Sequence, residues 1–239
     1  MIQADDIRSL FSNVELLDRE RHYLDTQAIR LSYVVNLVQE FCNQHTVHKI
    51  LDVGPHFLTR CVKEFIMPEV SVSTLGYEYP KLMPLDLVDE HVRYNLVDSI
   101  DNKPVVFNKA PFDLILFCET IEHIYISPNH VLSLLVALLK KPEGGLLIQT
   151  PNAVSLNKRL MMLRGLNPFE LLREDFEFKG HIREYTMGEL VNYGLNVGLS
   201  VWRKAFCSYW PHLCTNAIER SMQTLLPPLR PGLTVFFRS

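Results

Sequence analysis

The sequence contains no long apolar run and no cysteine pair in the C-x-x-C spacing. Its longest apolar stretch, near Val131–Leu139, is far shorter than the roughly 20 residues that a membrane-spanning helix needs. The five cysteines are odd in number, which favours reduced thiols over a disulfide framework or a zinc site. The first residues, MIQADDIRSLF, lack the basic and apolar regions of a secretory signal. These absences predict a soluble, cytoplasmic protein.

An excess of basic charge is also missing. The 24 Lys and Arg residues stand against 27 Asp and Glu, so the formal net charge is −3 and no global field draws the chain onto nucleic acid. We therefore expect no nucleic-acid partner. With 239 residues, 47% of them hydrophobic, the chain can form one large domain with a sizeable core.

Strand-like and helix-like segments alternate through the first two thirds of the chain. The segment PFDLILFCE is apolar without interruption, as expected of a strand that is covered on both faces. This rhythm predicts a doubly wound α/β fold with a parallel sheet and right-handed crossovers. The strands that we expect lie at 48–54, 70–79, 92–98, 111–119, 144–152, 199–206 and 231–239, with a helix before the last one at about 211–226.

The residues at the ends of the predicted strands are the first candidates for chemistry, because ligands of open parallel sheets bind beyond the carboxyl ends. Asp52 and Gly54 end the first strand, Glu78 follows the second and Asn95 the third. Each has an ordinary explanation as well: a turn often needs glycine, and a loop acid is often only solvated. The first loop lacks the GxGxxG pattern, which disfavours a nicotinamide-dependent dehydrogenase.

Taken in order, these strand ends resemble those of the class I S-adenosylmethionine-dependent methyltransferases. The resemblance runs from about Ile50 to Asn152, includes FDLILFCETIEH and GGLLIQTPN, and extends to GHIREYTMGEL. The most similar branch is that of the ubiquinone O-methyltransferases. The resemblance implies S-adenosylmethionine as cofactor and a seven-stranded, mostly parallel Rossmann-like sheet with an antiparallel last strand, helices on both faces and a helical lid insertion. We expect a single domain with a helical segment at 1–45, a cofactor-binding core at 46–152, a lid or substrate segment at 153–185 and C-terminal helices and strands at 186–239.

The resemblance also assigns roles to individual residues. It places Asp52 and Gly54 beside the methionine moiety and Glu78 on the ribose hydroxyls. The adenine would be bordered by Asn95 and Leu96, and the reactive sulfonium by Cys118 and Glu119.

One residue departs from the family pattern. The first loop of the family usually has a second glycine where this chain has His56. An imidazole there must turn away from the cofactor or occupy part of its place. A non-catalytic, methyltransferase-like binding or regulatory domain with a degenerate cofactor loop therefore stays open as the alternative.

The stretch CETIEH places three ionisable groups directly after the fourth strand. On a helix beginning near Glu119, that residue, Glu122 and His123 would share one face. Acids favour a helix N-terminus in any case. The resemblance suggests instead a divalent metal site, for Mg or Zn, completed by His181. Methylation of a hydroxyl needs a general base, such as His123 or Glu122, or an ion that lowers the pKa of the acceptor.

The segment Asn157–Arg173 mixes basic and apolar residues and is the candidate substrate lid. Such a stretch is usually a helix packed on its own domain with a wetted basic edge. It also suits peripheral contact with an anionic membrane, or a lipid-linked substrate. We expect a methyltransferase acting on a hydroxyl of a small molecule, a glycan or a lipid-linked acceptor.

Overall fold

The structure is a computed structural model that describes residues 1–66, 69–78, 87–171, 180–210 and 217–239. The described helices are α1 (Ala4–Leu10), α2 (Asp18–Gln44), α3 (Phe57–Phe65), α4 (Pro128–Leu138), α5 (Leu156–Leu163), α6 (Met187–Asn196) and α7 (Ala217–Leu225), with short 3-10 helices η2 (Leu96–Asp101), η3 (Ile121–His123) and η5 (Pro227–Leu229). The strands are β1 (Lys49–Val53), β2 (Ser71–Gly76), β3 (Glu90–Arg93), β4 (Leu114–Cys118), β5 (Gly145–Pro151), β6 (Ser200–Cys207) and β7 (Gly232–Arg238).

The strands form one seven-stranded sheet in the order β3-β2-β1-β4-β5-β7-β6. Strands β1 to β5 are all parallel to one another, and β7 lies antiparallel between β5 and β6. This is the mostly parallel, Rossmann-like sheet with an antiparallel last strand that the sequence predicts. The carboxyl ends of β1, β2, β4 and β5 consequently meet at one edge of the sheet.

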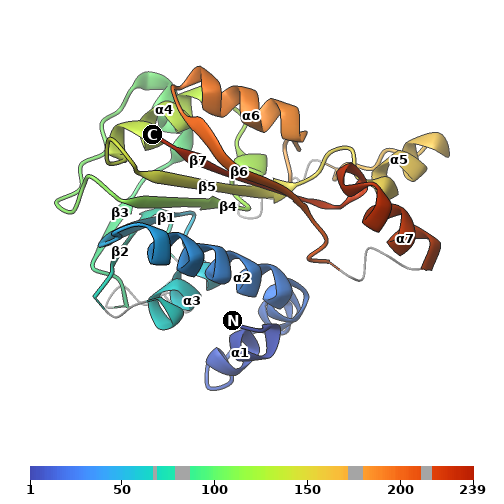
Figure 1. Cartoon of the computed structure of the whole chain (residues 1–239), viewed down its shortest axis with the longest axis horizontal. Helices are drawn as coiled ribbons and strands as arrows, with labels where there is room; N and C mark the ends of the chain where they lie inside the picture. The colour runs from blue at the N-terminus through green and yellow to red at the C-terminus, as the bar shows by residue number, and fades with distance from the viewer. Residues whose placement is uncertain (67–68, 79–86, 172–179, 211–216) are drawn as a thin grey trace.

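Helices cover the sheet on both faces, with α2 and α3 on one side and α4 and α6 on the other (Figure 1). The side chains of β4 show why this strand is apolar throughout. Leu114 and Leu116 point into the core on one face, while Ile115 and Phe117 point into the core on the other. The prediction of a strand buried on both faces is confirmed.

The helix that we predicted to begin near Glu119 does not exist. Glu119 has a left-handed backbone with φ of 49°, and it is followed only by the three-residue helix η3. The next α-helix, α4, begins at Pro128, a residue suited to the first turn because it has no N–H to satisfy. The chain therefore turns sharply after β4, and the prediction that Glu119, Glu122 and His123 share one helical face was wrong.

Other boundaries differ less. The third strand is the short β3, and the residues after it form η2, whose N-cap is Asn95. Within the predicted lid, α5 is the helix that the structure describes, and Arg173 lies outside the described residues. Residues 211–216 of the predicted C-terminal helix and Cys214 also lie outside them. The four described cysteines are unpaired. In the described part of the chain, no helix is both long and apolar enough to cross a membrane.

Candidate active site

Three segments that are distant in sequence come together around Gly54. Its N–H donates to the Leu75 carbonyl at 2.9 Å, which ties the end of β1 to the end of β2. A Cβ placed on Gly54 would lie 2.6 Å from Thr120 Oγ1, and one on Gly76 would lie 3.1 Å from Pro55 Cδ. Both glycines have positive φ, 79° and 142°. These turns therefore need glycine, as predicted for Gly54, and they leave backbone rather than side chain at the sheet edge.

The Asp52 carboxylate supports this loop from beneath. Asp52 is 2% exposed, and its Oδ2 accepts a hydrogen bond of 2.6 Å from Thr59 Oγ1. The same Thr59 hydroxyl accepts a hydrogen bond from the His56 N–H at the start of α3. Burial raises the pKa of Asp52 to about 7, although the Thr59 hydrogen bond opposes the shift. Asp52 thus fixes the loop between β1 and α3.

The His56 ring packs on the aromatic residues of the neighbouring helices. Its centroid lies 5.1 Å from that of Tyr23 and 4.8 Å from that of Phe57, edge to face in both pairs. Burial lowers the pKa of His56 to about 4, and the nearby Arg30 lowers it further. The imidazole is therefore neutral at pH 7 and lies on the side of the loop that faces α2.

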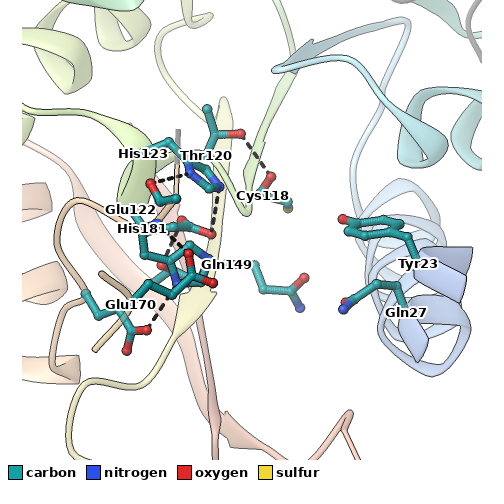
Figure 2. Close-up of polar contacts among 12 residues, drawn as sticks. Tyr23, Gln27, Cys118, Thr120, Glu122, His123, Gln149, Glu170 and His181 are labelled. Carbon is teal, nitrogen blue, oxygen red and sulfur yellow. Dashed lines mark hydrogen bonds and ion pairs between the residues drawn. The ribbon is translucent and has the colours of Figure 1, made fainter. Parts of the chain in front are cut away.

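A buried arginine on α2 belongs to the site, and the sequence reading missed it. Arg30 is 3% exposed and donates to Gln149 Oε1 at 3.0 Å, to Gln27 Oε1 at 2.8 Å and to Tyr23 Oη at 3.2 Å. Tyr209 Oη accepts from Gln149 Nε2 at 2.7 Å and so orients the amide. Figure 2 shows Tyr23 and Gln27 pointing from α2 toward Gln149. The sequence feature that could have indicated Arg30 is a charged residue within the apolar part of a predicted helix.

The structure brings Glu122, His123 and His181 together. One ligand atom from each lies within 4.8 Å of the others (Figure 2). Glu119 is not part of this group. Glu122 is fully buried, and its Oε2 accepts a hydrogen bond of 2.9 Å from Thr150 Oγ1. Its other oxygen, Oε1, accepts no hydrogen bond from the described residues and lies 4.0 Å from His123 Nε2.

Both imidazoles are held through their Nδ1 atoms. His123 Nδ1 lies 3.2 Å from the Gly180 carbonyl oxygen, and His181 Nδ1 lies 3.1 Å from Glu184 Oε1. An Nδ1–H that donates to such an acceptor fixes the tautomer and directs Nε2 toward a ligand. Glu184 also forms an ion pair with Lys158 of α5. Sequence reasoning missed Glu184, which carries no motif of its own, and placed Lys158 only within the candidate lid.

Burial shifts the pKa values of the charged groups in this cluster. Burial raises the pKa values of Glu119 and Glu122, and for Glu119 the charge of Glu122 adds to the effect. Burial lowers the pKa of Lys158 to about 8, although Glu119 and Glu122 oppose the shift. Buried carboxylates with an adjacent amine and imidazoles are groups that can move protons near neutral pH.

The remaining candidates lie at the same edge of the sheet. Glu78 is exposed two residues after Gly76, and Cys118 is the last residue of β4. Asn95 Oδ1 accepts from the Val97 N–H at 3.2 Å, so its carbonyl caps η2 and its amide group is the part available to a base. Leu96 is half-buried beside it. Their assigned contacts with a cofactor stay predictions.

Comparison with protein families shows to which family the chain belongs. The family model described as "Methyltransferase domain" matches residues 33–204, which cover most of the chain. The chain belongs to the methyltransferase domain family. The match spans the loops at Gly54 and Gly76, η3 and the segment of His181. A comparison with curated protein sequences gives no significant match.

Solved structures agree with the family. The chain is similar to an S-adenosylmethionine-dependent methyltransferase from Clostridium acetobutylicum, with 14% identity, a TM-score of 0.59 and coverage of 92% of this chain and 98% of the other. A counterpart from Archaeoglobus fulgidus has 14% identity, a TM-score of 0.55 and coverage of 91% and 99%. The plantazolicin methyltransferase BamL, in complex with a triazolic desmethylPZN analog and SAH, has 12% identity, a TM-score of 0.55 and coverage of 99% and 95%. The predicted class of enzyme, an S-adenosylmethionine-dependent methyltransferase, is confirmed.

Proposed function

We propose that this methyltransferase transfers the methyl group of S-adenosylmethionine to a hydroxyl oxygen of a small molecule or glycan, as enzymes of the ubiquinone O-methyltransferase branch do. The observation that carries the proposal is the convergence of Glu122, His123 and His181 at the edge where the glycine turns of β1 and β2 also lie. An alcohol is a weak nucleophile at neutral pH and needs such groups, whereas a neutral amine does not.

The residues at the sheet edge fit the cofactor. Gly54 and Gly76 end β1 and β2 in turns with positive φ, which let a ligand approach the backbone where other residues would carry a side chain. The bound cofactor supplies an electrophilic methyl group on its sulfonium. Asp52 and Gly54 would lie beside its methionine part and Glu78 would bind the ribose hydroxyls. In the proposed arrangement Asn95 and Leu96 border the adenine, and Cys118 and Glu119 lie beside the sulfonium.

Arg30 adds a role that the sequence did not suggest. Its guanidinium is buried near Glu119 and hydrogen-bonded on three sides. A fixed guanidinium beside β5 is suited to the carboxylate of the methionine moiety, since arginine has five N–H donors and three of them make these hydrogen bonds. Gln149 and Tyr209 would then act as positioning residues for Arg30.

The cluster of Glu122, His123 and His181 would prepare the acceptor. His123 Nε2 lies 4.0 Å from Glu122 Oε1, so an imidazolium formed when His123 takes the hydroxyl proton is next to a carboxylate. The same two histidines and one carboxylate also form a donor set for a divalent ion such as Mg or Zn. The buried Glu122 Oε1, which accepts no hydrogen bond from the described residues, fits that donor set. When bound, such an ion would lower the pKa of the acceptor hydroxyl.

Cofactor contacts can be tested by calorimetry of S-adenosylhomocysteine binding to Glu78→Ala. Loss of a charged acceptor for two hydroxyls should cost roughly 1.5–3 kcal/mol, which is about 10- to 100-fold in affinity. The matched control is Glu64→Ala, another exposed glutamate, on α3, which should bind as the wild type does. Equal affinity of Glu78→Ala and the control would mean that the strand end is misassigned.

The metal assignment has its own test. Wild type, Glu122→Gln and the exposed control Glu143→Gln are loaded with Mg²⁺ or Zn²⁺, desalted and measured for bound metal by plasma mass spectrometry. We expect metal in the wild type and in the control and its loss in Glu122→Gln. Negligible metal in all three proteins would leave His123 and Glu122 as acid–base groups only.

The non-catalytic alternative depends on His56. Its ring packs on Tyr23 and lies near Arg30, which is where the methionine moiety would bind. If the ring blocked the cofactor, His56→Gly would bind S-adenosylhomocysteine far more tightly than the wild type. We expect saturable binding in the wild type and little change in His56→Gly. A wild type that does not bind, together with a His56→Gly variant that does, would favour the degenerate domain.

A further inference from the structure

Helix α7 has its apolar stripe on the outside. Ile218, Met222 and Leu225 occupy one helical face at spacings of four and three residues, and they are 73%, 38% and 78% exposed. The polar Gln223 faces inward instead, with 5% exposure, and its Oε1 accepts from Ser208 Oγ at 3.1 Å. Arg230 Nε donates to the Gln223 backbone carbonyl. These contacts fix the helix with its apolar side toward solvent.

Helix α5 and the residues after it repeat this pattern. Met162 and Leu163 on the helix, and Leu166 and Leu171 beyond it, are 46%, 83%, 54% and 84% exposed. The other side of α5 is anchored, because Leu156 is buried and Lys158 forms its ion pair with Glu184. The expectation that this segment packs its apolar residues on its own domain was therefore wrong for these four side chains.

The exposed apolar residues are accompanied by arginines. Arg159 and Arg164 are exposed in the α5 segment, and Arg220 is exposed on α7. Among the described residues, Arg164 and Arg220 form no ion pair. The described acids of the two segments are Glu219, which is half-buried, and Glu170, which is exposed but whose Oε2 accepts a hydrogen bond from the His181 N–H. Among the described residues of the two segments, three exposed arginines therefore stand against one exposed acid, Glu170.

Figure 1 shows α5 and α7 at the same end of the molecule, beyond the carboxyl end of β5. We define the α5–α7 surface as the exposed residues Arg159, Met162, Leu163, Arg164, Leu166, Leu171, Ile218, Arg220, Met222, Leu225 and Leu226. This surface adjoins the candidate active site. Lys158 on the inner side of α5 pairs with Glu184, and Glu184 holds His181 of the cluster.

We propose that the α5–α7 surface docks the protein on an anionic lipid bilayer and that the acceptor hydroxyl belongs to an amphipathic molecule held in that bilayer. Leucine, isoleucine and methionine side chains would enter the boundary between headgroups and acyl chains, while the arginines contact lipid phosphates. In a two-fold dimer this surface would face its own copy and arginine would oppose arginine, so arginines with no acidic partner favour an anionic membrane over a second copy of the chain. The docking stands on these exposed residues alone; the nature of the acceptor rests on the proposed function.

The docking is tested by co-sedimentation with vesicles of phosphatidylcholine alone and of phosphatidylcholine with phosphatidylglycerol. We expect the wild type to bind the anionic vesicles, to bind neutral ones weakly and to dissociate with added salt. Removal of two charges in Arg164→Gln/Arg220→Gln should weaken binding about 30-fold. Leu163→Ser/Leu225→Ser should weaken it by more than about 10-fold. The control, Val106→Ser/Leu195→Ser, removes two apolar residues elsewhere that are 75% and 52% exposed, and it should bind as the wild type does.

All four proteins are also titrated with S-adenosylhomocysteine, which separates the two proposals. Unchanged cofactor affinity in the two surface variants, with lost vesicle binding, supports docking through the α5–α7 surface. Absence of cofactor binding in every protein, with vesicle binding intact, would remove the proposed function and leave the docking. Equal vesicle binding by the wild type and both surface variants would overturn the docking, as would a wild-type dimer in sedimentation velocity that Leu163→Ser/Leu225→Ser converts to monomer.

Discussion

Replacement of Gly54 by alanine separates two costs that the structure assigns to this position. Gly54 has φ of 79°, and a Cβ there would lie 2.6 Å from Thr120 Oγ1. Gly198 has nearly the same φ, 82°, but a Cβ on it meets nothing within 4 Å. Gly198→Ala therefore measures the backbone cost alone, and Gly54→Ala measures that cost plus the steric contact.

The magnitudes follow from the two environments. A left-handed conformation costs an alanine about 1–2 kcal/mol, and the loss of freedom in the unfolded chain returns about 0.4–1 kcal/mol. We thus expect a net loss of about 1 kcal/mol for Gly198→Ala. The Thr120 hydroxyl cannot move away freely, because it donates to the carbonyls of Cys118 and Val53. Overpacking of this kind adds about 1–3 kcal/mol for Gly54→Ala.

A third variant isolates the contact. Thr120→Ala removes Oγ1 and Cγ2 of residue 120. In that background the new Cβ at position 54 would lie 3.5 Å from the Cβ of residue 120, an ordinary van der Waals distance. Urea unfolding of the four combinations at positions 54 and 120, with Gly198→Ala alongside, gives the coupling energy directly. The reasoning is refuted if Gly54→Ala costs no more than Gly198→Ala, or if its excess cost persists once Thr120 is alanine.

Two further predictions concern groups beneath the site. Burial raises the pKa of Asp52 to about 7, above its unfolded value of ~3.9, so its contribution to stability is full below about pH 4 and is lost as the pH rises to about 7. The stability of the wild type relative to Asp52→Asn should fall across that window in urea titrations, and a constant difference would contradict the pKa. Gln149→Leu removes one of the three acceptors of the buried Arg30 guanidinium and should destabilise the fold by about 1–3 kcal/mol. The exposed control Gln44→Leu should lie within about 0.5 kcal/mol of the wild type, and a similar value for Gln149→Leu would mean that Arg30 does not depend on the amide.

Much of the fold was predictable because it depends on local pattern. The uninterrupted apolar run of β4 requires cover on both faces, and β4 contributes to the cores on both sides of the sheet. Gly54 was predicted from its place at a strand end, and its positive φ confirms why glycine stands there. Glu122, His123 and His181 do converge, although the predicted helix was wrong, because the short helix η3 brings Glu122 and His123 to the same side.

The missed features depend on contacts that no local pattern contains. Arg30 and Gln149 are 119 positions apart in sequence, and a single arginine in a helix reads as a solvated residue until its partner is known. The apolar stripe of α7 faces solvent, although apolar residues at this spacing usually form a buried helical face. Residues at Ile218, Met222 and Leu225 predict a buried face, yet the inward position is occupied by the hydrogen-bonded Gln223.

The claim on which the function depends is that the glycine turns of β1 and β2 and the end of β4 form one site for an adenosyl sulfonium. Isothermal titration of the wild-type chain with S-adenosylmethionine and S-adenosylhomocysteine measures this directly. We predict saturable binding of both at one site per chain. Binding weaker than about 1 mM for both ligands, a free energy smaller than about 4 kcal/mol, would contradict the account.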